Sequence, residues 1–324
     1  MKAVSIGSNG VEIIETSEPT PKDQQVLVKV FACGLNRSDL LETQGQSFGH
    51  TGGETKILGG EFAGEIVDCG AEVKNLKIGD KVMCRGGSGW AEYALAHYRR
   101  TIPINSDDLN WEQAATIQGN LQTMHDAIVT NGKFLSGKTV FIQGASSAVG
   151  LIGLQISKAL GASLTIGSSM NDERRGKLKQ FGADEVIDTG NENWLEALLE
   201  HTDGKGVDIL IDMLSGNFVN KNMEATKING HIINIGRLAG MNGDFDYDLH
   251  AKRRLNYIGT TGRTRSIDEN EKVANLANKD LWHLVLEGKI RHHIDQVFPL
   301  NEAKYALNIM NENKHFGKLV LLIN

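Results

Sequence analysis

Residues 138–169 contain the pattern that most limits what this chain can fold into. They begin with Lys-Thr-Val-Phe-Ile-Gln-Gly, continue with small residues over 145–150 and an apolar run, and end in a second short apolar segment. The β-branched and aromatic residues of the first segment are typical of a buried parallel strand. Val149, Ile152 and Ile156 fall on one helical face. The stretch predicts a strand–helix–strand unit whose turn lies at a helix N-terminus, where backbone N–H groups favour a pyrophosphate.

The turn between that strand and helix is a variant of the dinucleotide-binding fingerprint G-x-G-x-x-G. Ala145, Ser147 and Gly150 stand at its three glycine positions. Alanine and serine are small enough for close backbone approach, and the Ser147 hydroxyl can donate to a phosphate. The competing interpretation is a plain crossover without a cofactor, but such a crossover has no need for four small residues in succession. The cofactor contacts that we expect from this turn are Ser146, Ser147, Ala148 and Val149.

The end of the second strand indicates which nucleotide binds. NAD-binding units usually carry an Asp or Glu there, which holds the ribose 2′-hydroxyl. This chain has Ser168 and Ser169 instead, followed by Arg174 and Arg175. Neutral hydroxyls and a guanidinium suit a 2′-phosphate, so we expect NADPH, held by Ser168, Ser169 and Arg174. The alternative for Arg174 is a solvated charge on a helix surface.

The pattern of the whole chain indicates two domains. Residues 1 to about 100 contain short β segments between glycine-rich turns, which is typical of a small barrel-like domain. From Lys138 onward, apolar strand patterns alternate with helical ones, which predicts a doubly wound parallel sheet. The predicted fold class is therefore α/β, and a length of 324 residues is compatible with two domains.

Charge and composition argue against several classes of protein. A net charge of −6 gives no basic footprint for nucleic acid. No apolar run approaches the ~20 residues that a membrane span requires. Met1 leads directly into an apparent strand, so we expect no secretory leader. Cys33, Cys69 and Cys84 are widely spaced, which favours a reducing, cytoplasmic location.

Four longer strings are similar to motifs of one enzyme family. They read Gly-Leu-Asn-Arg-Ser-Asp-Leu-Leu-Glu-Thr-Gln-Gly at 34–45, then Ile-Leu-Gly-Gly-Glu-Phe-Ala-Gly-Glu-Ile-Val at 57–67, followed by the strings at 86–94 and 310–320. In this order they resemble the zinc-independent quinone oxidoreductases of the medium-chain dehydrogenase/reductase superfamily, especially the branch that includes the tumour-suppressor-inducible quinone oxidoreductase. The resemblance covers essentially the whole chain. It implies a GroES-like β-barrel catalytic domain over 1–121 and 262–324, and a Rossmann domain over 122–261.

The resemblance also implies that no metal is bound. Zinc-dependent relatives hold a catalytic zinc with a Cys, a His and a second Cys, and the matching positions here are Asn36, Gly60 and Gly119. None of these is a plausible zinc ligand. Three cysteines also cannot fill the four-cysteine lobe of a structural zinc.

Two residues are the catalytic candidates that the resemblance implies. Asn36 matches a position that makes a polar contact to substrate or nicotinamide, and Thr123 matches a threonine beside the nicotinamide. Their alternatives are an asparagine in a turn after a strand and a threonine in a helix interior. Asp39 is expected to anchor its loop through Arg37. The further cofactor contacts implied by the resemblance are Gly236, Arg237, Thr260, Thr261 and Lys318.

The acceptor pocket and the oligomeric state follow only from the resemblance. Where the branch often has a proline-rich segment and a tyrosine, this chain has Ser-Phe-Gly-His at 47–50, and Phe48 is the candidate to stack on a flat substrate ring. Relatives pair through the last strand of the nucleotide domain, here from Leu255 to Thr261. We therefore expect a homodimer.

Three functions remain open at this stage. The first is an NADPH-dependent reductase of quinones or related activated carbonyls, acting by direct, metal-free hydride transfer. The second is an NADPH-dependent reductase of 2-alkenal or enoyl-thioester double bonds. A coenzyme A thioester would need a basic phosphate patch, for which Arg99, Arg100, Arg253, Arg254 and Arg263 are candidates. The third is a non-enzymatic NADPH-binding protein. In each case the expected partner is a small molecule, with neither nucleic acid nor membrane involved.

Overall fold

The computed structural model describes residues 1–7, 10–45, 57–104 and 109–323, and the chain divides into two compact units. Unit 1 comprises residues 1–119, 262–274 and 292–324. Unit 2 comprises residues 120–261 and 275–291. Each unit contains its own sheet, and the two units are described separately below.

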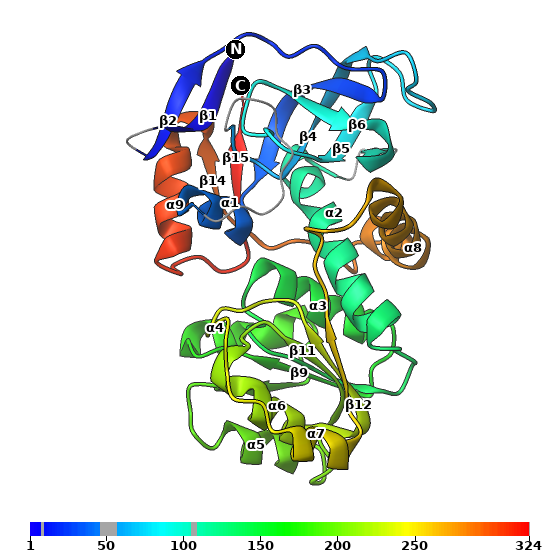
Figure 1. Ribbon diagram of the computed structural model, residues 1–324, viewed down its shortest axis with the longest axis vertical. Coiled ribbons are helices and arrows are strands. Elements are labelled where there is room, and N and C mark those ends of the chain that lie inside the picture. Colours follow the sequence, from blue (N-terminus) through cyan, green and yellow to red (C-terminus); the bar gives the residue numbers. More distant parts are fainter. Residues whose placement is uncertain (8–9, 46–56, 105–108, 324) are drawn as a thin grey trace. The chain divides into compact units, whose positions relative to one another are not determined.

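Unit 1 is built on a seven-stranded, mainly antiparallel sheet with the order β14-β15-β3-β4-β5-β7, in which β6 also pairs with β3 (Figure 1). Its strands are β3 (Gln25–Gly34), β4 (Glu61–Cys69), β5 (Lys81–Arg85), β6 (Tyr93–His97), β7 (Thr101–Pro103), β14 (Ile294–Pro299) and β15 (Lys318–Leu322). A separate antiparallel pair consists of β1 (Lys2–Gly7) and β2 (Gly10–Glu15). The helices α1 (Arg37–Thr43) and α9 (Ala303–Asn311) lie beside each other.

Alternating side chains decide which face of this sheet is apolar. Val26, Val28 and Val30 are buried on one face of β3, as the two-residue period of a strand requires. Phe62 of β4 and Cys84 of β5 join the same core. Their neighbours in sequence therefore point to the opposite face, where the polar residues described below are found.

Unit 2 is built on a six-stranded parallel sheet with the order β10-β9-β8-β11-β12-β13. Its strands are β8 (Thr139–Ile142), β9 (Leu164–Ser168), β10 (Glu185–Ile187), β11 (Val207–Asp212), β12 (Thr226–Asn234) and β13 (Asn256–Gly259). The chain starts at the centre, moves to one edge and then returns to build the other half. The strand order reverses between β8 and β11, and in open α/β sheets ligands bind beyond the carboxyl ends of the strands at such a point.

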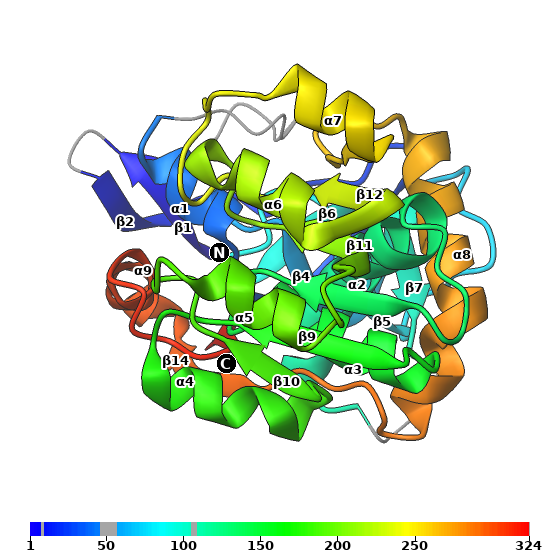
Figure 2. The same ribbon diagram turned by 90° about the horizontal axis from the view of Figure 1, so that it is seen from below.

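Helices cover both faces of the unit 2 sheet. They are α3 (Ala148–Ala159), α4 (Asp172–Lys177), α5 (Trp194–Glu200), α6 (Val219–Ala225) and α7 (Tyr247–Arg253). Figure 2 shows α3 and α6 on opposite sides of the strands, as right-handed crossovers require. The glycines of α3 allow close packing, because a Cβ on Gly153 would lie 2.8 Å from Cδ1 of Ile142. On the other face, Trp194, Leu198 and Met223 share one core with the strands.

Two long helices contain the boundaries between the units. The helix α2 (Trp111–His125) passes from unit 1 to unit 2 at residue 119 and continues as a π-helical turn, Asp126–Asn131. The helix α8 (Ile267–Leu286) does so at residue 274. Our sequence-based division placed all of 262–324 in the first domain, whereas 275–291 lies in unit 2. There Asp280 pairs with His125, and the backbone of Arg291 exchanges two hydrogen bonds with the Gln155 amide.

None of the helices in the described residues combines the length and the apolar character that crossing a membrane requires.

Candidate functional site

The turn after β8 has the geometry of a phosphate-binding turn. Gly144 adopts φ +64°, a left-handed conformation that glycine accepts without strain. Ser147 caps α3: its Oγ accepts a hydrogen bond from the Gly150 N–H at 3.2 Å and donates to the Gly144 carbonyl at 2.9 Å. The turn is therefore held in one tight shape at the N-terminus of a twelve-residue helix.

Gly150 is required by the packing of α3 on that turn. A Cβ at this position would lie 2.6 Å from Cα of Ala145 and 2.8 Å from its carbonyl oxygen. Any side chain would push the helix away from the turn. The position matches the third glycine of the fingerprint, whose role is this close approach.

The serines predicted to recognise the ribose lie next to the turn. Ser168 is buried, and its Oγ accepts from the Gly144 N–H at 3.2 Å. The Ser169 hydroxyl donates to Oγ of Ser146 at 3.2 Å and accepts from the Asn171 N–H at 3.3 Å. The structure thus brings Ser146, Ser168 and Ser169 together. Ser168 holds the turn through its hydrogen bond to the Gly144 N–H.

The two arginines after β9 have different surroundings. Arg175 donates to the Ser169 carbonyl at 2.9 Å and forms ion pairs with Asp172 at 2.6 Å and Asp188 at 3.2 Å. It therefore fixes the end of β9. Arg174 is half-buried, and its backbone N–H donates to the Asn171 cap of α4. No role for Arg175 was predicted from the sequence.

A buried carboxylate organises the ends of the next three strands. Asp212 has no exposed surface, and its Oδ1 accepts from the backbone N–H groups of Leu214 (2.9 Å) and Ser215 (2.8 Å). Its Oδ2 accepts from the Asn234 amide and from the Tyr257 hydroxyl, both at 3.2 Å. Burial and the nearby carboxylate raise the pKa of Tyr257. These contacts join β11, β12 and β13 at their carboxyl ends.

Ser215 adopts a strained conformation beside this carboxylate. Its φ of +58° and ψ of −147° lie in a region that is close to glycine-only, and such strain persists where surrounding contacts enforce it. The bond to Asp212 and a second one from Ser215 Oγ to the Gly236 carbonyl, at 2.7 Å, enforce it here. Strained backbone of this kind concentrates at functional sites.

A cavity of about 180 Å³ opens at these strand ends. Its lining includes Ser215, Asn234, Arg237, Phe245 and Tyr257. Of the residues predicted from the sequence, Arg237 lines it directly. Gly236 lies against the residue that follows β11, because a Cβ there would be 2.6 Å from the Met213 carbonyl.

The remaining predicted residues of unit 2 lie directly after β13 and on α2. The Thr260 N–H donates to the Asn234 carbonyl at 2.9 Å, which keeps the end of β13 in register. Thr261 is exposed, and Thr123 is half-buried on α2.

In unit 1, Asn36 and Lys318 form a direct pair. Asn36 caps α1, and its N–H donates to Oδ2 of Asp39 at 2.7 Å. The Lys318 ammonium donates to Oδ1 of Asn36 at 2.8 Å and forms an ion pair with Glu61. Lys318 is 1% exposed, so its ammonium group lies inside unit 1. From the sequence we expected Lys318 to contact the cofactor.

Asp39 is a buried acidic residue that is bonded to the backbone of Asn36. It has no exposed surface, and burial is the main cause that raises its pKa to about 7. The expected pairing of Asp39 with Arg37 is wrong, because the Asp39 carboxylate turns inward to the Asn36 N–H while Arg37 donates to Asn313 at 2.6 Å.

Two family models match the chain. A model described as alcohol dehydrogenase GroES-like domain matches residues 22–106, and a model described as zinc-binding dehydrogenase matches residues 148–279. They fall on unit 1 and on the strand–helix repeats of unit 2, in the order that the sequence predicted. The chain belongs to the medium-chain dehydrogenase/reductase superfamily. The predicted superfamily and the predicted fold, a GroES-like domain with a parallel α/β sheet, are confirmed.

Curated relatives within the superfamily include quinone oxidoreductases. The chain is 28% identical over 338 residues to the quinone oxidoreductase of Homo sapiens, which covers 100% of this chain and 98% of that protein. It is 27% identical over 326 residues to a phenolphthiocerol/phthiocerol polyketide synthase of Mycobacterium tuberculosis. That match covers 97% of this chain and 14% of the synthase, so the chain spans a small part of the first relatives that it matches.

Solved structures share the whole fold. The CurK enoyl reductase superposes with a TM-score of 0.86 at 21% identity, covering 100% of this chain and 99% of that one. A mycobacterial protein, Rv1454c, solved in complex with NADPH, gives a TM-score of 0.88 at 21% identity, covering 99% of both chains. At these identities the likeness establishes the fold.

The positions that hold zinc in some members of the superfamily are occupied differently here. Asn36 accepts from the Lys318 ammonium. A Cβ on Gly119 would lie 2.6 Å from Oε2 of Glu61, so the Glu61 carboxylate fills the space where a side chain would start. Across residues 1–7, 10–45, 57–104 and 109–323, no group of three His, Cys, Asp or Glu side chains could hold a metal ion.

The structure also contains polar residues that our sequence analysis missed. Glu61, Asp212 and Tyr257 were not singled out, because their roles arise from contacts between strands that are distant in sequence. One signal was available: Asp212 and Asn234 both end apolar strands, and polar side chains at the carboxyl ends of parallel strands meet at one edge of a sheet. Phe48, the predicted substrate residue, lies outside the described residues.

Proposed function

We propose that this protein is an NADPH-dependent, zinc-independent reductase of quinones or related activated carbonyls. The observation that carries the proposal is the orientation of the Asn36 amide. An ammonium has donors only, so the atom that faces Lys318 must be the carbonyl Oδ1. The Nδ2 hydrogens therefore point elsewhere, and within the described residues they meet no acceptor. Such a fixed donor suits a carbonyl oxygen that gains negative charge as a hydride arrives.

Unit 2 carries the proposed cofactor site. The turn from Gly144 to Gly150 fits a pyrophosphate, because its backbone reaches the N-terminus of α3 and Gly150 leaves the space that a Cβ would fill. Gly236, Thr260 and Thr261 at the strand ends, together with Thr123, are the proposed contacts to the nicotinamide half. When bound, NADPH supplies a hydride, that is two electrons and one proton, and solvent supplies the second proton that completes a hydroquinone.

A preference for NADPH over NADH is supported by the end of β9. Ser168 and Ser169 stand where NAD-binding units carry a carboxylate, and the hydroxyls of Ser146 and Ser169 lie together. Arg174 follows on the first turns of α4, and the carboxylates of Asp172 and Asp188 nearby are paired with Arg175. Tryptophan-fluorescence titration with both nucleotides tests this. Arg174→Ala should reduce the preference for NADPH at least about tenfold, since it removes a charge-assisted contact to the 2′-phosphate. Loss of affinity for both nucleotides alike would argue that Arg174 does not recognise that phosphate.

The absence of a catalytic zinc is proposed from the chemistry around Asn36. A buried ammonium already binds the Asn36 oxygen, and Gly60 and Gly119 offer no ligand atoms. We expect purified protein to contain less than about one zinc per ten chains, and NADPH oxidation to survive dialysis against EDTA. Stoichiometric zinc, or activity lost with EDTA and restored by Zn²⁺, would contradict the proposal.

A double-bond reductase is the second candidate. It is supported by the fold shared with an enoyl reductase and by the similarity to a segment of a polyketide synthase. Parallel assays with 1,4-benzoquinone, trans-2-hexenal and crotonyl-CoA separate the two functions by their kcat/KM values. If bound NADPH is consumed with none of them, a non-enzymatic NADPH-binding role is favoured.

We also propose that two copies pair through the segment from Leu255 to Thr261. This proposal is supported by the position of β13 at the edge of the six-stranded sheet, where one side of the strand has no neighbour within the described sheet. A cytoplasmic location is proposed from the three cysteines, all of which are free.

A further inference from the structure

Unit 1 buries two carboxyl groups close to one ammonium. The side chains of Asp39, Glu61 and Lys318 are all buried. The Lys318 ammonium forms an ion pair with Glu61 and donates to Oδ1 of Asn36 at 2.8 Å. This ion pair packs against the end of β3, since a Cβ on Gly34 would lie 2.3 Å from Oε1 of Glu61 and 3.0 Å from Cε of Lys318. The ion pair is therefore enclosed next to the segment that carries Asn36.

Asp39 uses one of its two carboxyl oxygens to bind Asn36. Its Oδ2 accepts from the Asn36 N–H at 2.7 Å. Its Oδ1 is buried and has no hydrogen-bond partner within the described residues. In a carboxylate this oxygen would be a buried, charged acceptor without a donor, whereas in a neutral acid it carries the proton. The unpaired buried charge costs more free energy, so these surroundings favour the neutral acid.

The charged neighbours of Asp39 come from three elements of unit 1. Burial has the largest effect on the pKa of Asp39, which is raised to about 7. Glu61 on β4 and Glu42 on α1 add to the rise of this pKa through their carboxylates. The hydrogen bond from the Asn36 N–H and the ammonium of Lys318 on β15 oppose it. Asp39 therefore changes its charge near neutral pH, and it does so next to an ammonium.

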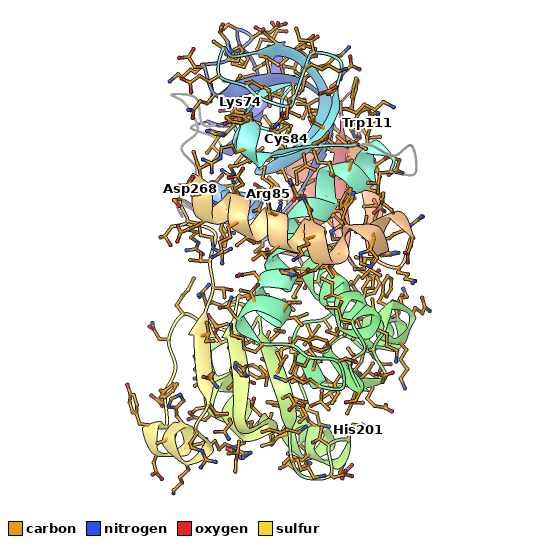
Figure 3. All side chains as sticks on the ribbon, turned by 90° about the vertical axis from the view of Figure 1, so that its right-hand side faces the viewer. Lys74, Cys84, Arg85, Trp111, His201 and Asp268 are labelled. Carbon is orange, nitrogen blue, oxygen red and sulfur yellow. The ribbon has the colours of Figure 1, made fainter. Side chains whose placement is uncertain are left out.

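Three further titratable groups near this ion pair keep one charge state around neutral pH. Burial raises the pKa of the Cys33 thiol on β3 well above its usual value. Burial, together with the charge of Lys318, lowers the pKa of His292 to about 3. Arg85, labelled at the end of β5 in Figure 3, lies opposite Glu61 in the pairing of β4 with β5. As a guanidinium it keeps its charge. None of these three groups therefore accompanies the titration of Asp39.

We propose that Asp39 is a positioning residue for Asn36. As a neutral acid it holds the Asn36 N–H and leaves the Lys318 ammonium on the Asn36 amide oxygen. As a carboxylate it attracts that ammonium to its Oδ1, because opposite charges attract strongly in a buried site, and the Asn36 amide is released. Asp39 exchanges its proton with solvent and is not the acid that completes the hydroquinone. This inference rests on the proposed reductase function, in which the Asn36 amide donates to the acceptor oxygen.

The pH dependence of kcat tests this role. Stopped-flow oxidation of saturating NADPH by 1,4-benzoquinone should be about tenfold slower at pH 8 than at pH 6 in wild type, because about one-tenth of Asp39 stays protonated at pH 8. Asp39→Asn keeps an acceptor for the Asn36 N–H and has no titrating group, so its rates at the two pH values should agree within about twofold. Glu42→Gln, the matched control on the same helix, should keep the fall.

A nuclear magnetic resonance signal tests the inference without turnover. The side-chain amide of Asn36, assigned by its absence in Asn36→Ala, should shift with a midpoint near pH 7 in wild type and stay fixed in Asp39→Asn. An amide signal that does not move with pH in wild type would overturn the inference. So would a kcat that is equal at pH 6 and pH 8, or a fall that persists in Asp39→Asn, while the reductase stands. If no acceptor oxidises NADPH at all, the reductase proposal fails and the amide signal still decides whether Asp39 controls Asn36.

Discussion

Lys318 is the residue on which the proposed chemistry of unit 1 depends. Its ammonium lies 1% exposed between the Asn36 oxygen and the Glu61 carboxylate. Burying both charges is acceptable because each is the partner of the other, and removing one leaves an uncompensated charge. The ion pair therefore also orients the Asn36 amide. Breaking it should lower stability through the unpaired buried charge, and should lower activity through the loss of that orientation.

We expect Lys318→Met to cost about 3–5 kcal/mol of unfolding free energy, because it leaves the Glu61 carboxylate buried without its ion partner. The double variant Lys318→Met/Glu61→Gln should recover at least half of that loss, since no ionic charge then remains between the two positions. Urea unfolding measures both. If the double variant is no more stable than the single one, lost packing rather than the isolated charge explains the cost.

Asn36 provides a kinetic prediction at the same scale. Asn36→Ala should lower kcat for quinone about 10²-fold, the scale seen when one donor to a developing oxyanion is removed, while the affinity for NADPH stays within about twofold. Stopped-flow measurement of NADPH oxidation and a fluorescence titration supply the two numbers. A fall in NADPH affinity with kcat retained would instead assign Asn36 to the cofactor.

Asp39 makes stability depend on pH in an unusual direction. Burial raises its pKa from 3.8 to about 7, so between these values the folded state holds a proton that the unfolded chain has released. Stability from this group is present below about pH 4 and is lost as the pH rises to about 7, by at most about 1.4 kcal/mol per pH unit. The free energy of unfolding of Asp39→Asn, relative to that of wild type, should therefore be higher at pH 8 than at pH 5.

Urea unfolding at the two pH values checks this, with Glu18→Gln as a control on an exposed carboxylate. A difference between Asp39→Asn and wild type that is the same at both pH values would mean that Asp39 is ionised throughout.

At the scale of elements, local patterns were readable and contacts between distant strands were not. The strand β8, the turn and α3 are consecutive in sequence, so their small residues and apolar face predicted them directly. The helix α1 was missed, because the sequence Asn36-Arg-Ser-Asp39 is equally typical of a turn, and here the Asp39 carboxylate caps it. The strand β14 was missed because its burial does not alternate regularly.

The buried ion pair between Glu61 and Lys318 could not be predicted from the sequence for a related reason. The two residues are neighbours only because β3 pairs with β4 on one side and with β15 on the other in one particular register. A shift of one residue in any pairing would turn a side chain to the other face. Composition did not reveal it either, since a net charge of −6 does not say which charged side chains lie together.

The packing of α3 on its turn can be tested with two glycines. Gly150→Ala should weaken NADPH binding at least about tenfold and cost about 1–3 kcal/mol of stability, because its Cβ would meet the Ala145 backbone at 2.6 Å. Gly176→Ala on α4 is the matched control: a Cβ there meets nothing within 4 Å, and we expect a gain of about 0.5–1 kcal/mol from helix propensity. Isothermal titration and thermal unfolding supply both quantities. Full NADPH affinity in Gly150→Ala would show that the turn tolerates a displaced helix.

At the scale of the whole molecule, the backbone N–H and C=O groups on the outer side of the edge strand β13 need hydrogen-bond partners. The edge strand β13 pairs with β12 on one side and has no strand of the described sheet on the other. Such an edge presents backbone donors and acceptors to any matching chain, and proteins shield it or pair it. Around a two-fold axis the edge strands of two copies can pair with each other, which satisfies both edges with one contact.

We therefore expect a mass of two chains by analytical ultracentrifugation at micromolar concentration, with or without NADPH. A salt series from 0.05 to about 1 M NaCl is the control, because backbone pairing is less sensitive to screening than ion pairs are. Loss of the dimer only at high salt would place the contact on charged side chains elsewhere. A single-chain mass throughout would mean that the chain itself protects β13, and the two-fold arrangement would have to be abandoned. A dimer that persists in high salt and exchanges the amide hydrogens of β13 slowly would locate the contact at that edge, since amides in paired strands exchange only on opening.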